Sequence, residues 1–202
     1  PNSTRSVSEL RLSLKVQPTG ILGGVQGPRT VHLDIVDYPG EWLLDLDLVE
    51  QTFRQWSGDT LARIADRPQA QAYLNKVQHA HALSDWQEPL AKDLSETFTR
   101  YLDAARRDGY YDMTPGRFLL PGDLEGSPAL TFAPLIDEDR PDRKGLWREM
   151  ERRFDAYKAK VVKPFFRDHF SRIDRQIVLV DALGAIHSGP QAVHDLNRAM
   201  VS

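Results

Sequence analysis

The chain has 202 residues, of which 41% are hydrophobic, and this is enough for one large domain or for one domain that carries an insert. Its formal net charge of −3 argues against a general nucleic-acid binder, and no apolar run approaches the roughly 20 residues of a membrane span. The absence of cysteine excludes disulfides, thiolate metal sites and cysteine nucleophiles, and it fits a reducing compartment.

The first part of the chain is predicted to form two strands. Residues 10–16 alternate between apolar and polar side chains, which is typical of a half-buried strand. The run 31–36 is more continuously apolar and predicts a second strand that is buried on both faces. The stretch 17–30 between them is rich in glycine and proline, so we expect an antiparallel hairpin with Asp37 at the exit of its second strand.

A mostly helical block is predicted next. Apolar residues at helical spacing predict helices over 42–64 with a break at Ser57-Gly58, over 69–83, from Ser84 to before Gly109 with Ser84 and Gln87 at capping-box spacing, and from Leu146 with a kink or restart at Pro164. Short strands fit residues 118–120 and 130–132. The apolar run 177–180 then predicts a central strand, 184–190 a loop, and 191–200 a last helix.

Strands separated by helices favour an α/β domain. The helical block over 42–173 is too long for an ordinary crossover, so we interpret it as an insert between two partial core segments, 1–41 and 174–202. The chain starts at Pro1 in a polar stretch without a signal peptide, which suggests a fragment.

The turn Asp37-Tyr38-Pro39-Gly40 carries the candidate chemistry. A carboxylate at a strand end can hold Mg²⁺ directly or through water, and a glycine three residues later lets the backbone approach a terminal phosphate. The spacing alone is a weak signal, and a strand end in which Asp37 only caps a Pro-Gly turn is the simpler interpretation. The strand before the turn and the helical pattern after it strengthen the phosphate hypothesis.

Five segments of the chain carry specific motifs, at residues 33–46, 115–123, 161–166, 174–181 and 188–192. Together they resemble the YcjX-like family of bacterial stress-associated P-loop NTPases. The segment around Asp37 also resembles, more distantly, the switch II region of Ras-type GTPases. The resemblance implies a Ras-like P-loop NTPase core with a large, mostly helical insert that begins with the switch II helix. It further implies Mg²⁺-dependent GTP hydrolysis in a bacterial stress response, with the insert relaying the nucleotide state to an unknown protein partner.

The resemblance also assigns roles by position. Asp37 would hold Mg²⁺ and Gly40 would donate its amide to the γ-phosphate of GTP. Glu41 falls where small GTPases place the glutamine that orients the attacking water, although a carboxylate there is repelled by the γ-phosphate unless its charge is compensated. Thr4 is the candidate hydroxyl ligand of Mg²⁺ and Arg5 the candidate phosphate-facing arginine, but a solvent-exposed Thr-Arg pair is the simpler interpretation.

Two motifs of such enzymes do not occur in these residues. The phosphate-cradling G-x-x-x-x-G-K-[ST] is absent, because the glycine cluster 20–27 is followed by Pro28-Arg29-Thr30, and the guanine-specifying N-K-x-D is absent too. We therefore interpret the chain as the middle of a GTPase domain, which should bind GTP or GDP poorly by itself. A non-enzymatic scaffold module and an ATPase remain as alternatives. We expect a cytoplasmic protein that could also reach the inner membrane through a partner.

Overall fold

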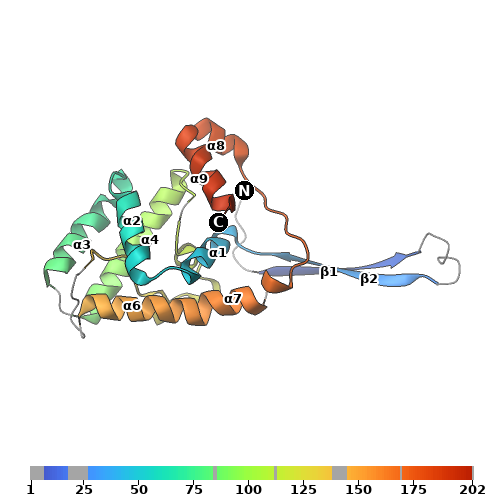
Figure 1. Cartoon of the computed structure of the whole chain (residues 1–202), viewed down its shortest axis with the longest axis horizontal. Coiled ribbons are helices and arrows are strands. Elements are labelled where there is room, and N and C mark those ends of the chain that lie inside the picture. Colours follow the sequence, from blue (N-terminus) through green and yellow to red (C-terminus); the bar gives the residue numbers. More distant parts are fainter. Residues whose placement is uncertain are drawn as a thin grey trace. The chain divides into compact units, whose positions relative to one another are not determined.

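The structure is a computed structural model that describes residues 7–17, 27–83, 86–111, 113–137, 145–168 and 170–201 (Figure 1). It divides into two units, Pro1–Gly40 and Glu41–Ser202. The described residues are mostly helical and contain one two-stranded antiparallel sheet. The predicted α/β domain is thus confirmed in part. The hairpin and the helical block are present, but the parallel sheet of a P-loop core is not evident among the described residues.

The first unit contains the predicted hairpin, formed by β1 (Ser8–Val16) and β2 (Arg29–Asp37). The two strands pair antiparallel with Leu12 opposite Leu33, and this register gathers aliphatic side chains on one face. That aliphatic face consists of Leu10, Leu12, Leu14, Val16, Val31, Leu33 and Ile35. On the other face Arg11 Nη2 donates to Asp34 Oδ2 at 2.8 Å, and Ser13 Oγ lies 3.0 Å from His32 Nδ1.

The predicted burial of the second strand on both faces is wrong. Its side chains are exposed except for that of Val36, which is half-buried, and those of β1 are exposed as well, with Leu10 55% exposed. The reason is visible in the sequence, because His32 and Asp34 interrupt the apolar run and return it to a period of two. The hairpin therefore has one apolar face rather than two.

The second unit is built from helices, and its principal elements are α1 (Gly40–Leu43), the 3₁₀ segment Leu44–Val49, α2 (Phe53–Ile64), α3 (Gln71–Leu83), α4 (Glu88–Arg107), α5 (Gly116–Leu119), α6 (Leu146–Tyr157), the π-helical turn Lys158–Val162, α7 (Lys163–Asp168), α8 (Ala182–Ser188) and α9 (Pro190–Val201). The predicted helices over 69–83, 84–109 and 191–200 are confirmed by α3, α4 and α9. No helix among the described residues is both long and apolar enough to cross a membrane.

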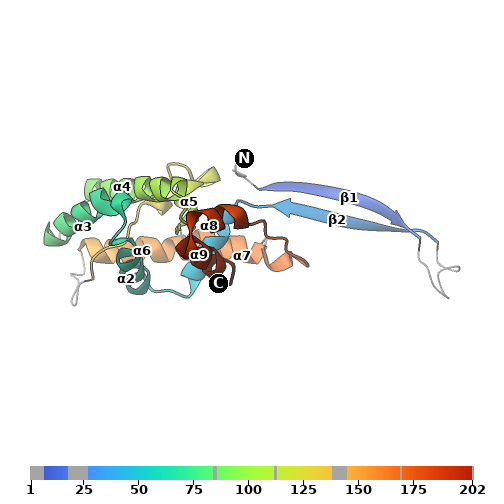
Figure 2. The same cartoon turned by 90° about the horizontal axis from the view of Figure 1, so that it is seen from above.

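An aromatic core holds the helical unit together, and α2, α3, α4 and α6 gather around it (Figures 1 and 2). Trp56 of α2 stacks on Phe154 of α6 at 5.1 Å between ring centroids and meets Phe98 of α4 edge-on at 6.1 Å. Such pairs contribute about 0.5–1.5 kcal/mol beyond the burial of their area. Trp147, Phe154, Tyr157 and Phe165 recur at helical spacing over α6, the π-helical turn and α7, and all four are buried.

The predicted break in the first helix lies elsewhere. Residues 50–52 separate the 3₁₀ segment from α2, which then runs through Gly58 without interruption. The stop and restart come from a capping box, in which the Gln55 N–H donates to Thr52 Oγ1 at 3.2 Å and the Thr52 N–H donates to Gln55 Oε1 at 3.0 Å. This cap specifies the start of α2, whereas an interior glycine only weakens a helix.

We expect Thr52→Ala to lower the free energy of unfolding by about 1 kcal/mol, because the first turn of α2 loses a hydrogen-bond acceptor. Thr52→Ser is the matched control, since it keeps the hydroxyl and should stay near the parent. Urea denaturation followed by circular dichroism would measure both variants. Coinciding unfolding curves for Thr52→Ala and the parent would contradict this role of the cap.

The long helix that begins at Leu146 restarts near Pro164, as predicted, but the change begins upstream of the proline. After α6 the chain forms the π-helical turn, in which the Lys163 N–H donates to the Lys158 carbonyl, and α7 follows. Proline has no N–H and its ring clashes with the carbonyl of the residue four positions earlier, here Lys160. The wider π turn accommodates this clash without ending the helix.

Four further predictions are corrected. Phe118 lies in α5 and Leu130 in a 3₁₀ turn, so neither belongs to a strand. The run 177–180 forms no strand, because no described strand pairs with its backbone, and Leu179 is 92% exposed.

The expected loop over 184–190 contains most of α8, which Asp181 caps by accepting from the Gly184 N–H at 2.8 Å. Ser84 lies outside the described residues, and the N-cap of α4, Gln87, makes no side-chain capping bond.

Candidate functional site

The candidate turn lies where β2 ends. Asp37 is the last residue of β2, opposite Ser8 of β1, and it is exposed. Tyr38 and Pro39 lead from it to Gly40, which opens α1. A Cβ built on Gly40 would meet no atom within 4 Å, so its backbone can be approached closely. The unit Pro1–Gly40 thus presents a carboxylate and an accessible glycine three residues apart.

Two of the residues assigned by resemblance cannot be placed beside this turn. Thr4 and Arg5 lie outside the described residues, as does most of the glycine cluster that precedes Gly27. The remaining candidate, Glu41, is the first residue of the second unit.

Glu41 is engaged by the helical unit. Its carboxylate forms an ion pair with Arg106, in the last turn of α4, and the two side chains are 17% and 32% exposed. The guanidinium of Arg106 compensates the negative charge of Glu41, which a carboxylate would need beside a phosphate. Arg106 was not predicted from the sequence, because nothing local distinguishes it from Arg107, the next residue of the same helix.

Asp45, one turn beyond Glu41, is a buried carboxylate that the sequence pattern did not reveal. It is 2% exposed and accepts hydrogen bonds from the Tyr157 hydroxyl at 2.6 Å, the Gly116 N–H at 2.7 Å and the Arg117 N–H at 3.3 Å. Burial raises the pKa of Asp45 to about 6, while these hydrogen bonds and the charge of Arg117 act in the opposite direction. This carboxylate joins the 3₁₀ segment, α5 and the end of α6.

Trp42 of α1 makes a second set of contacts, with the end of α5 and with α7. Its Nε1–H donates to the Leu120 carbonyl at 2.9 Å, and the Arg117 guanidinium lies 3.2 Å from the centroid of its ring. Phe165 of α7 meets the same ring edge-on at 5.8 Å. Trp42 and Asp45 thus pack the segment that follows Glu41 against α5, the end of α6 and α7.

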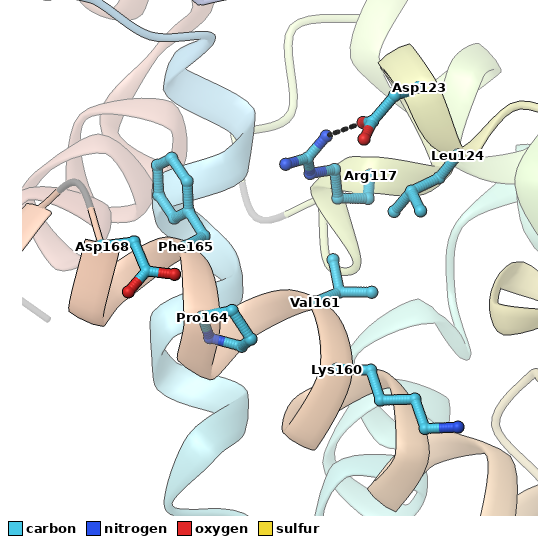
Figure 3. A pocket seen from close by; sticks show the side chains of 8 residues that line it. All are labelled: Arg117, Asp123, Leu124, Lys160, Val161, Pro164, Phe165 and Asp168. Atoms are coloured by element: carbon cyan, nitrogen blue, oxygen red, sulfur yellow. Dashed lines mark hydrogen bonds and ion pairs between the residues drawn. The ribbon is translucent and has the colours of Figure 1, made fainter.

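An open cavity of about 180 Å³ lies beside these contacts (Figure 3). Figure 3 shows the guanidinium of Arg117 directed at Asp123, with the closest atoms 3.4 Å apart. Lys160 and Asp168 also line the cavity. Two basic and two acidic side chains give the lining no excess positive charge with which to hold a nucleotide phosphate.

The comparisons with known proteins cover the entire chain. A model of the YcjX-like family, DUF463, matches residues 1–202. The chain belongs to the YcjX-like family. It is 39% identical over 216 residues to a protein of Shewanella oneidensis named Ras-like GTPase YcjX, and 38% identical over 214 residues to a protein of the same name from Escherichia coli K12. These matches cover 99% of this chain but only 44% and 45% of the two relatives.

Membership in the YcjX-like family confirms the resemblance drawn from the sequence motifs. Three of the motifs meet at the contacts described above. Residues 33–46 supply Asp45 and Trp42, residues 115–123 supply the backbone that both contact, and residues 161–166 supply Phe165. In this member of the YcjX-like family, these motifs therefore build the attachment of the segment that follows the D-x-x-G turn.

Proposed function

We propose that this chain is part of a Mg²⁺-dependent GTPase in which Asp37 and Gly40 serve the bound nucleotide. The observation that carries the proposal is the turn after β2, where an exposed carboxylate and an open glycine backbone stand at D-x-x-G spacing. Bound Mg²⁺ would supply the positive charge that phosphoryl transfer requires. Asp37 would hold that ion through water, and the Gly40 N–H would donate to the γ-phosphate. Thr4 and Arg5 remain candidates for the same site.

In this proposal, the phosphate-cradling and guanine-specifying motifs belong to parts of the protein outside these 202 residues. The chain spans less than half the length of the relatives it matches, and neither G-x-x-x-x-G-K-[ST] nor N-K-x-D occurs in its 202 residues. The exposed aliphatic face of the hairpin and the exposed run 177–180 support partial core segments over 1–41 and 174–202. Residues 42–173 would be the helical insert, which relays the nucleotide state to a protein partner in a stress response.

A second candidate is a scaffold module with weak or lost turnover. It is favoured by the aromatic core of the helical unit, whose described members all lie between Leu48 and Val162. Such a module would offer the same surface to a partner whether or not nucleotide is bound. Hydrolysis measurements separate the two candidates.

We expect Asp37→Asn in the full-length protein to reduce Mg²⁺-dependent GTP hydrolysis about tenfold or more, because the amide holds the ion less well than the carboxylate. Phosphate release from GTP and from ATP, with and without Mg²⁺, would be measured for parent and variant. Asp34→Asn is the matched control, since Asp34 lies on the same strand and pairs with Arg11. Equal turnover in Asp37→Asn and the parent would favour the scaffold.

A further inference from the structure

The boundary between the two units falls inside the candidate motif, between Gly40 and Glu41. Asp37 and Gly40, the proposed ion and phosphate contacts, belong to one unit. Glu41, to which the family resemblance assigns the water-orienting role, belongs to the other and is ion-paired there with Arg106 of α4. The side chain of Glu41 is therefore held by α4 of its own unit.

The backbone of Glu41 lies in close contact with Gly116. A Cβ built on Gly116 would overlap the carbonyl carbon and oxygen of Glu41, well within the 3.0 Å that real Cβ atoms keep. The N–H of the same glycine donates to Asp45, whose other oxygen accepts from Tyr157. Contacts at the backbone, at the carboxylate and one turn later thus attach Glu41 to α4, α5 and α6.

The neighbours of Arg106 make different contacts. Arg107 pairs with Asp103 on the exposed side of α4, and Arg100, two turns earlier, donates to Thr97 at 2.8 Å. Among the contacts of the described residues, Arg106 is the cation that engages Glu41. A carboxylate that orders water beside a γ-phosphate needs such a neighbour, because two uncompensated negative charges repel each other.

We propose that Arg106 is a positioning residue for GTP hydrolysis, which fixes and neutralises Glu41 so that the helical unit sets the rate of the reaction. This inference rests on the proposed function and deepens it by naming the residue through which α4 acts. Arg106 touches neither nucleotide nor metal in this role. Its influence passes entirely through the Glu41 carboxylate, so it must disappear when that carboxylate is removed.

The test is a double-mutant cycle in the full-length protein, with kcat and KM for GTP measured for the parent, Arg106→Ala, Glu41→Gln and the double variant. We expect Arg106→Ala to lower kcat about tenfold to a hundredfold with little change in KM, since misplacement of a reacting group by about 1 Å has effects of that size. Arg106→Lys should recover part of the loss. Adding Arg106→Ala to Glu41→Gln should change kcat no further.

Arg107→Ala is the matched control, because it removes the same charge from the same turn of α4 without reaching Glu41, and it should keep the parental kcat. Arg106→Gln takes the place of the alanine variant should that variant not fold, because it keeps a long helix-forming side chain. A parental kcat in Arg106→Ala, or an equal loss in the Glu41→Gln background, overturns the inference. If Asp37→Asn abolishes turnover while Arg106→Ala keeps it, only this inference fails; a parent that hydrolyses no GTP overturns the proposed function as well.

Discussion

Replacement of Gly116 by alanine is expected to lower the free energy of unfolding of the helical unit by about 3 kcal/mol or more. The added Cβ would overlap the backbone of Glu41, and a backbone carbonyl cannot rotate away as a flexible side chain can. Overpacking of this kind costs about 1–3 kcal/mol. Relief requires α5 to move away, which weakens the hydrogen bond from Gly116 to Asp45 and leaves a buried carboxylate short of a donor, at a further cost of about 1–3 kcal/mol.

Gly58→Ala is the matched control for this substitution. Gly58 lies within α2, and a Cβ built there would meet no atom within 4 Å. Alanine should therefore raise the free energy of unfolding by about 0.5–1 kcal/mol, as expected for an interior helical glycine. Urea denaturation followed by tryptophan fluorescence would show the two variants moving in opposite directions. A Gly116→Ala midpoint at or above that of the parent would contradict the close approach.

The second large effect is a pH dependence that originates at Asp45. Burial raises the pKa of this carboxyl in the folded protein to about 6, above its ordinary value of 3.8. Between these two values the folded state binds more protons than the unfolded state, so stability falls as the pH rises. The contribution of Asp45 is fully present below about pH 4 and is lost as the pH rises through about 6. The total loss should reach about 3 kcal/mol.

Asp45→Asn removes the titrating group and keeps two of the three hydrogen bonds, because an amide can accept from the Gly116 N–H and donate to the Tyr157 oxygen. The longer bond from the Arg117 N–H is lost. Unfolding free energies of parent and variant would be compared in urea at intervals from pH 4 to pH 8. Other titrating groups are common to both proteins, so the difference between the two curves isolates Asp45. We expect the variant to gain on the parent as the pH rises to about 6, and a constant difference would refute the assignment.

Local patterns in the sequence predicted much of the fold. Alternation over 10–16 and helical spacing after Pro89 describe neighbouring residues of one element, and the hairpin and α4 are confirmed. The capping box of Thr52 and Gln55 is equally local, and it outweighs the glycine at which the helix was expected to break. The strand expected over 177–180 failed for a different reason, because a strand also needs a partner and none of the described strands pairs with it.

The contacts around Glu41 lay beyond prediction because they depend on residues far apart in the chain. Asp45 stands in an alternating run of leucine and aspartate in which Asp47 has the same local setting, and only the packing of Tyr157 and Gly116 against it selects the buried one. In the sequence Gly116 simply follows Pro115, and only the structure shows that the Glu41 backbone leaves no room there for a side chain. The D-x-x-G turn was predictable as a motif, whereas the long-range contacts of Glu41 and Asp45 that follow it were not.

The setting of Trp42 gives the protein an optical reporter. The indole follows Glu41 directly, lies under the charge of Arg117 and donates to the Leu120 carbonyl. Because indole emission responds to nearby charge and hydrogen bonding, any shift of the segment after the turn changes the colour and intensity of this fluorophore. Subtracting the spectrum of a Trp42→Phe protein removes the signals of Trp56, Trp86 and Trp147. Movement of the peptide that carries Glu41 can then be followed in real time without an attached label.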